Sequence, residues 1–109
     1  MRDKVRRRYF ALKIDSNEKI SQKEFMDAVW ETILRLYGEY GASKMGLTLI
    51  NYDADKGLAI IRATHTEIDK FRAAIAFITG MAAKPAAVRI ITVSGTLKAL
   101  HKKIGIKTH

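Results

Sequence analysis

Apolar and polar positions alternate along four short segments of the chain, which is the periodicity of half-buried β-strands. The segments are rich in β-branched and aromatic residues, and they cover residues 7–14, 47–53, 57–63 and 88–93. Only the triplet "ADK" at 54–56 separates the second segment from the third, so we expect these two strands to form a hairpin.

A helix is predicted between the first and second strands. Ser21 and Glu24 have the spacing of a capping box, in which each side chain bonds the backbone N–H of the other residue. Gly38 and Gly41 are predicted to end the helix, because glycine adopts the left-handed conformation that closes many helices. Apolar residues recur at helical spacing on more than one side, so we expect broad burial. They are Phe25, Val29, Ile33 and Leu36, with Met26, Trp30 and Tyr37 beside them.

Two more helices are predicted further along the chain. Thr64 and Glu67 repeat the capping-box spacing and begin a helix that is expected to end near Gly80. After the fourth strand, a basic helix is predicted from Thr96 to about Ile104.

The resulting order, β-α-β-β-α-β followed by a helix, predicts a ferredoxin-like or RRM-like α+β sandwich. Such a fold has a four-stranded antiparallel sheet with two helices on one face. At 109 residues the chain has room for a single domain. We divide it into a basic arm at 1–5, a core at 6–94, and a basic C-terminal helix and tail at 95–109. RNA-binding, regulatory and enzymatic proteins all use this fold, so function must be argued from particular residues.

The two crossover helices leave one face of this sheet uncovered. If Phe10 and Leu12 face the helices, alternation puts Tyr9 and Ala11 on the open face. In RNA-recognition modules this face carries aromatic side chains that stack on bases. The corresponding stretch "KGLAIIRA" at 56–63 has aliphatic residues at those positions, so the sequence does not predict a base-stacking surface.

The same alternation adds residues from the third and fourth strands to the open face. They are Leu58, Ile60 and Arg62, with Arg89, Ile91 and Val93. A face that is apolar in its middle needs a cover, which is either the C-terminal helix or a protein partner. We predict a protein interface at five of its residues. They are Tyr9, Ala11, Leu58, Ile60 and Ile91.

Positive charge is concentrated at the two ends of the chain. The formal net charge is +9, of which residues 1–14 and residues 89–109 contribute +5 each, while the 74 residues between them sum to −1. This distribution is typical of a protein that binds a polyanion. We favour nucleic acid over a merely solubilising surface, because solubility does not require one sign of charge at both ends.

Several other classes of protein lose support from features that the sequence lacks. The absence of cysteine excludes disulfides and thiolate chemistry, and it favours a cytoplasmic location. No apolar run reaches the roughly 18 residues of a membrane span, and we expect no signal peptide. His65, His101 and His109 lack metal-ligand spacing, so no metal or other cofactor is expected to bind the chain itself.

The junction "VSGTLKALHKK" combines a helix start with a lysine cluster. Ser94 or Thr96 can cap the helix, whose first N–H groups have no partner within it. Gly95 leaves the backbone open to close approach, and the positive end of a helix suits a phosphate. Lys98 and Lys102 share one side of the helix. Spacing alone leaves open whether this junction is only a capped helix or also a phosphate site.

Four segments of the chain match one protein family in order and spacing. They are "RRRYFALKI" (6–14), "AVWETILRLYGEYGASKMGLTLINYD" (28–53), "KGLAIIRATH" (56–65) and "VSGTLKAL" (93–100). Together they resemble archaeal ribonuclease P protein component 2, the Pop-five family shared with eukaryotic ribonucleases P and MRP. The resemblance covers nearly the whole chain and departs from the family at the short C-terminal tail "GIKTH".

The resemblance implies a non-catalytic subunit of ribonuclease P, the ribonucleoprotein that cleaves 5′ leaders from precursor tRNA. In that family the RNA carries catalysis with bound Mg²⁺. The protein binds the catalytic domain of the RNA together with the barrel-shaped protein component 3, and two copies associate, which implies a heterotetramer. With the charge pattern, the resemblance predicts RNA contacts at nine residues and no catalytic residue. They are Arg6, Arg7, Arg8, Ser94, Gly95, Thr96, Lys98, Lys102 and Lys103.

Three alternatives remain open. An acylphosphatase-like enzyme would share the topology, but it needs a glycine-bearing phosphate loop after the first strand, where this chain has "DSNEK". No Walker motif or catalytic dyad is present either. A small-ligand regulatory domain would not require basic ends. A generic single-stranded RNA module is weakened by the missing aromatic residues.

Overall fold

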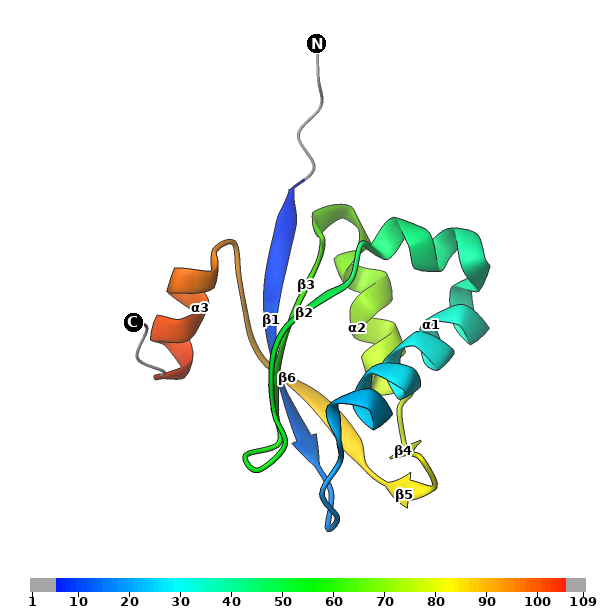
Figure 1. Ribbon diagram of the computed structural model, residues 1–109. Helices are drawn as coiled ribbons and strands as arrows, with labels where there is room; N and C mark the ends of the chain where they lie inside the picture. Colours follow the sequence, from blue (N-terminus) through cyan, green and yellow to red (C-terminus); the bar gives the residue numbers. More distant parts are fainter. Residues whose placement is uncertain (1–5, 106–109) are drawn as a thin grey trace.

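The computed structural model describes residues 6–105 and is built on a four-stranded sheet (Figure 1). The strands are β1 (Arg7–Asp15), β2 (Thr48–Asp53), β3 (Leu58–Thr64) and β6 (Ala87–Ser94). They lie in the order β2-β3-β1-β6, and each neighbouring pair is antiparallel. The first and last of these strands therefore lie side by side, and the predicted ferredoxin-like sandwich is confirmed. The predicted arm at 1–5 and the end of the tail lie outside the described residues.

Two helices cover one face of the sheet. α1 (Gln22–Met45) and α2 (Ile68–Ala76), which follows the 3₁₀ turn η1 (His65–Glu67), lie on the same side in Figure 1. The core between these helices and the sheet includes Phe10 and Phe71, whose ring centroids are 4.8 Å apart. Among residues 6–105, no helix combines the length with the hydrophobicity that crossing a bilayer requires.

α3 (Leu97–Ile104) lies on the opposite face of the sheet, as Figure 1 shows. Its Leu100 is fully buried against Ala11 and Ile60, which belong to the centre of that face. The sequence left open whether the C-terminal helix or a protein partner covers this face. In the structure, the C-terminal helix covers its centre.

The start of α1 forms the predicted capping box. The Glu24 N–H donates to the Ser21 hydroxyl oxygen at 3.1 Å, and the Ser21 N–H donates to the Glu24 carboxylate at 2.9 Å. Lys84 donates to the same carboxylate at 3.1 Å. The sequence signal was local, since both capping partners lie within one turn, and it needed no tertiary information.

The end of α1 differs from the prediction, which was wrong. Gly38 does adopt a left-handed φ of 73°, but this residue kinks the helix instead of ending it. The chain continues as a helix through Gly41 to Met45, and it finishes at Gly46, whose φ is 56°. Ala42 and Met45 are buried in the core, so packing of this second helical segment outweighs the low helix propensity of the two glycines.

The start of α2 also differs from the prediction. Thr64 makes no capping hydrogen bond, and a 3₁₀ turn precedes the α-helix. The Glu67 side chain is buried and accepts a hydrogen bond from the Thr66 hydroxyl at 3.1 Å, so it does not return to Thr64. The helix ends before a small hairpin of β4 (Gly80–Met81) and β5 (Lys84–Pro85), which the sequence did not predict.

A bulge in β6 changes which side chains face the helices. The pairing register shifts between Ala11 and Leu12 of β1, which leaves Ile91 as an extra residue in β6. Val93 consequently pairs with Phe10 and packs into the helix-side core. Its predicted place on the open face is wrong, because simple alternation does not allow for an inserted residue.

Glu24 gives the stability of the fold a specific dependence on pH. Hydrogen bonds from the Ser21 N–H and from Lys84 hold the pKa of this carboxyl below its ordinary range. Such a carboxylate stabilises the fold at pH values above its ordinary pKa, and this contribution is lost as the pH falls through the lower, folded value.

We therefore expect wild type to lose more unfolding free energy than Glu24→Gln when the pH is lowered from about 6 to about 3. Glutamine keeps a capping-box oxygen but does not titrate, so it serves as the matched control. Urea denaturation at the two pH values measures the difference. Equal losses in both proteins would contradict the lowered pKa.

Candidate nucleic-acid interface

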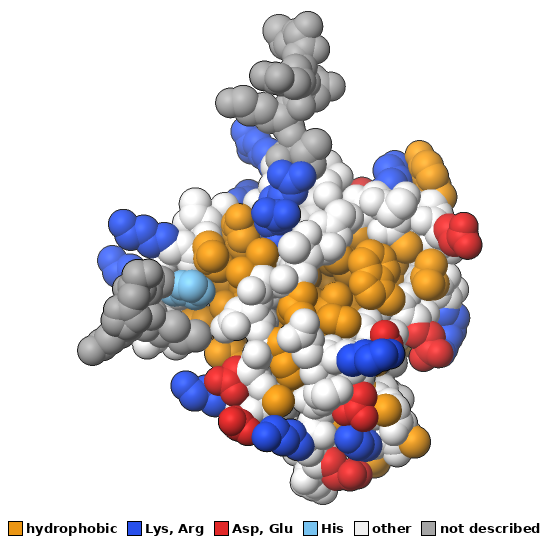
Figure 2. All heavy atoms as spheres, viewed as in Figure 1, with side chains coloured by type: hydrophobic (Ala, Val, Ile, Leu, Met, Phe, Trp, Pro, Cys, Tyr) orange, Lys and Arg blue, Asp and Glu red, His pale blue; other side chains and the backbone are white. Residues whose placement is uncertain are grey.

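The two basic ends of the chain meet at one end of the sheet. β1 starts where β6 finishes, since Tyr9 pairs with Ser94 in the antiparallel ladder. Residues 6–8 and residues 94–98 are therefore neighbours in space although they are far apart in sequence. Figure 2 shows lysine and arginine side chains around the start of β1 and beside α3, with hydrophobic side chains between them.

Arg8 lies between the ends of β3 and β6. Its Nε donates to Nδ1 of His65, the first residue after β3, at 3.0 Å. On its other side, a Cβ added to Gly95 would lie only 2.7 Å from Arg8 Nη1. The guanidinium thus occupies space that the missing side chain of Gly95 leaves, just before α3. The sequence pointed to Arg8 and Gly95 separately, and it gave no indication of His65.

Thr96 caps α3, and its hydroxyl oxygen accepts a hydrogen bond from the Ala99 N–H at 3.1 Å. The predicted cap is confirmed. Buried Ser94 accepts from the Thr96 N–H at 3.4 Å, which links the end of β6 to the start of the helix. Gly95 and Thr96 are themselves exposed, so the first turn of α3 is accessible from solvent.

The lysines of α3 differ in their surroundings. Lys98 and Lys102 are exposed and lie one turn apart on the same side of the helix. Lys103 turns back and donates to the Val93 carbonyl oxygen at 3.1 Å. Within residues 6–105, no carboxylate forms an ion pair with these lysines or with residues 6–8. The described part of the fold therefore does not neutralise the charge at this end.

α3 occupies much of the face that was predicted to meet a protein partner. Ala11 and Ile60 are fully buried beneath the helix, and Tyr9 and Leu58 are half-buried. Of the predicted interface residues, Ile91 has the most free surface and is 43% exposed. In this conformation the lysines on the outer side of α3 are more accessible than the centre of the sheet beneath the helix.

Three large apolar side chains of α1 are exposed, which the sequence did not predict. Leu34 and Tyr40 are 44% and 76% exposed, and Leu36, which was predicted to be buried, is exposed as well. Figure 2 shows a broad hydrophobic area on this side of the molecule. The sequence does contain apolar residues on more than one side of this helix, but it predicts that they are buried.

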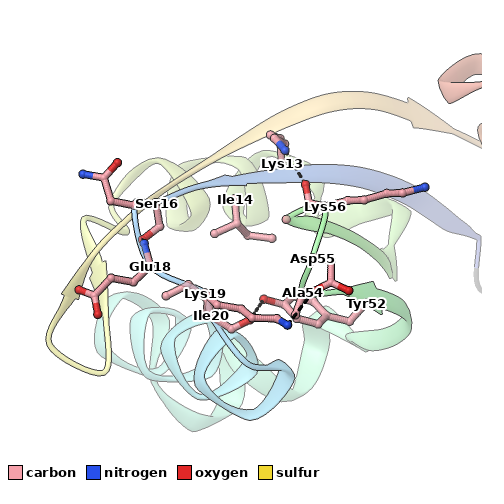
Figure 3. A pocket seen from close by; sticks show the side chains of 12 residues that line it. Lys13, Ile14, Ser16, Glu18, Lys19, Ile20, Tyr52, Ala54, Asp55 and Lys56 are labelled. Atoms are coloured by element: carbon pink, nitrogen blue, oxygen red, sulfur yellow. Dashed lines mark hydrogen bonds and ion pairs between the residues drawn. The ribbon is translucent and has the colours of Figure 1, made fainter.

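The opposite end of the sheet contains a pocket of about 300 Å³ between the loop after β1 and the turn after β2 (Figure 3). Two of its charged side chains, Lys19 and Asp55, form an ion pair. The hydrogen bond between Lys19 and Asp55, 2.6 Å long, raises the pKa of the lysine and lowers that of the aspartate. Lys13 donates to the Lys56 carbonyl oxygen, and the Ser16 hydroxyl donates to a carbonyl of β5 at 2.8 Å. The side chains of Lys13, Ser16 and Lys19 are therefore already engaged in contacts within the protein.

Metal binding has no support in the described part of the chain. Between residues 6 and 105, no three His, Asp or Glu side chains come together in a way that could hold a metal ion.

Comparisons with known proteins agree with one another. A protein-family model described as the Rpp14/Pop5 family matches residues 8–105. Ribonuclease P protein component 2 of Pyrococcus abyssi is 33% identical over 103 residues, which cover 94% of this chain and 86% of that protein. The protein of the same name from Halorubrum lacusprofundi is 33% identical over 100 residues, but the match spans only 63% of its length and 88% of this chain.

The same fold occurs in a solved structure. A chain in the cryo-EM structure of yeast ribonuclease MRP superposes with a TM-score of 0.72, and the match covers 96% of this chain and 92% of that one. Its sequence is 21% identical, so this similarity supports the fold alone.

Replacing Thr96 by alanine should lower the free energy of unfolding by about 1 kcal/mol, because the Ala99 N–H loses its acceptor. Thr96→Ser keeps the hydroxyl and should remain close to wild type. Urea denaturation of the three proteins measures the effect. An unchanged midpoint in Thr96→Ala would show that the cap is not formed in solution.

Proposed function

This chain belongs to the Rpp14/Pop5 family, and on that basis we propose that it is a protein subunit of ribonuclease P, the ribonucleoprotein that removes 5′ leaders from precursor tRNA. The observation that supports an RNA-binding role most directly is the unneutralised positive charge where β1 and α3 begin. The family match runs from Arg8 through α3, so it includes most of the residues that form this charged end.

In this proposal the chain contributes binding energy and no catalytic group. The RNA carries the chemistry with its own Mg²⁺ ions, and the protein binds no cofactor. A folded RNA crowds its phosphates together, and cationic side chains relieve that repulsion by displacing condensed counterions. The arginines at residues 6–8 and the exposed Lys98 and Lys102 would serve this purpose, and the compact RNA fold would then need less Mg²⁺.

A single phosphate fits best at the junction between β6 and α3. The positive end of the α3 dipole, the exposed Gly95 backbone and the Arg8 guanidinium lie together there. Arginine binds phosphate with two parallel N–H groups, so Arg8 would add direction as well as charge. Capping by Thr96 and phosphate binding are compatible, because the Thr96 hydroxyl bonds only the Ala99 N–H.

We further propose two protein partners: the barrel-shaped component 3 and a second copy of this chain. Support for a protein partner comes from the exposed apolar side chains of Leu34, Leu36 and Tyr40 on α1, because burying apolar side chains against a partner is favourable. The centre of the open face is a weaker candidate, because α3 already buries Ala11 and Ile60.

A generic RNA-binding module outside ribonuclease P is the alternative that we retain. The charged end supports RNA binding in either case, and only the family match distinguishes the two functions. The enzyme alternative has less support, because at the pocket in Figure 3 Lys19 pairs with Asp55 and Lys13 donates to the Lys56 carbonyl oxygen.

Reconstitution tests the proposed function. Cleavage of a precursor tRNA by the cognate ribonuclease P RNA is measured at modest Mg²⁺, with component 3 present throughout and this chain added or omitted. We expect cleavage at the mature 5′ end to appear, or to rise strongly, only when the chain is added. No change with active RNA and intact component 3 would contradict the subunit role.

Replacing Lys98 and Lys102 together by alanine should weaken binding to the same RNA and flatten its salt dependence. The slope of log K against log salt is negative. If each lysine contacts one phosphate, the slope should become less negative by roughly 1.4–1.8 in total. Lys19→Ala/Lys23→Ala is the matched control, because it removes the same charge from two lysines that pair with Asp55 and Asp27. An unchanged slope in Lys98→Ala/Lys102→Ala would show that these lysines do not contact phosphate.

A further inference from the structure

We propose that His65 is a positioning residue for RNA binding, which holds the Arg8 guanidinium at the start of α3 so that its free edge faces a phosphate. This role rests on the function proposed above and adds a residue that was not among the predicted RNA contacts. Three features support it: the hydrogen bond between the two side chains, the space beside Gly95, and the absence of a carboxylate partner for Arg8 within residues 6–105.

The hydrogen bond determines the chemical state of the histidine. Arg8 Nε can only donate, so His65 Nδ1, 3.0 Å away, must accept with an unprotonated nitrogen. The tautomer that makes this hydrogen bond carries its proton on Nε2. The histidine is anchored as well, because its backbone N–H donates to the Arg6 carbonyl oxygen at 2.7 Å and extends the pairing of β1 with β3.

Gly95 leaves room for the guanidinium on the side opposite His65. Its φ is not in the left-handed region, so its backbone conformation does not require glycine. A Cβ at this position would lie 2.7 Å from Arg8 Nη1, so any larger residue would displace the guanidinium from its present place. The absence of a side chain thus lets the guanidinium lie between His65 and the turn into α3.

A neutral partner suits this task better than a charged one. A carboxylate could also hold an arginine, but it would cancel the charge that attracts phosphate. Held by His65 through Nε, Arg8 keeps its full charge, and its two Nη groups make no hydrogen bond to a residue between 6 and 105. In the proposal these two groups donate parallel hydrogen bonds to a phosphate. Holding the side chain in advance also reduces the rotamer entropy that is lost when RNA binds.

The test measures binding of the full chain to the cognate ribonuclease P RNA over a range of salt concentrations at fixed Mg²⁺. His65→Leu fills the site but cannot accept a hydrogen bond, and we expect it to weaken binding by about 2- to 10-fold. His65→Asn places its amide oxygen near the position of Nδ1, and it should recover most of the affinity. Arg8→Ala should make the slope of log K against log salt less negative by roughly 0.7–0.9.

The decisive comparison repeats His65→Leu in the Arg8→Ala background. We expect no further loss of affinity there, because the histidine acts only through the arginine. Arg89→Ala is the control for loss of an arginine charge, since Arg89 pairs with Asp15 at the other end of β6 and should matter little. Urea denaturation of every variant separates loss of binding from loss of folding. Recovery of affinity in His65→Asn would independently show that the loss in His65→Leu comes from the missing hydrogen-bond acceptor.

Each outcome decides between the alternatives. A loss in His65→Leu that persists undiminished in the Arg8→Ala background would overturn the proposal. So would full affinity in Arg8→Ala when Lys98→Ala/Lys102→Ala binds weakly, although that result would leave the proposed function intact. If the wild-type chain does not bind the RNA at all, the proposed function fails, and the positioning role fails with it.

Discussion

Antiparallel pairing between β1 and β6 is the interaction on which the rest of this molecule depends. It places the first strand between β3 and the last strand, so Phe10 and Leu12 lie at the centre of the core. It also brings the two cationic ends of the chain together, although the segment between them is close to neutral. The core and the charged end are therefore consequences of one strand pairing, and losing it would remove both.

The two faces of the sheet are covered in different ways. Two long-range crossovers put α1 and α2 on one face, whereas α3 folds back onto the other face directly from β6. Leu100 fixes α3 there, and this places the exposed lysines beside the arginines of β1. The same arrangement covers the centre of the open face and leaves side chains on the outer sides of α1 and α3 exposed.

The sequence predicted the elements of this fold because their signals are local. Alternation, a capping box and short turns are all encoded within a few residues, and these signals placed every strand of the main sheet. Features that depend on distant contacts were missed. Burial of Met45 carries α1 past Gly38 and Gly41, and the bulge at Ile91 reverses the side of Val93. The contact between Arg8 and His65 joins residues 57 positions apart, so no spacing rule could reveal it.

The direction in which the chain enters the sheet has a practical consequence. Arg6, the first described residue, precedes β1 at the cationic end, so anything fused ahead of it starts beside the surface that we assign to RNA. The turn at residues 54–57 lies at the far end of the sheet, because Leu58 pairs with Lys13 near the end of β1. A fluorophore or affinity handle introduced at that turn would report on assembly without occupying the region where the arginines gather.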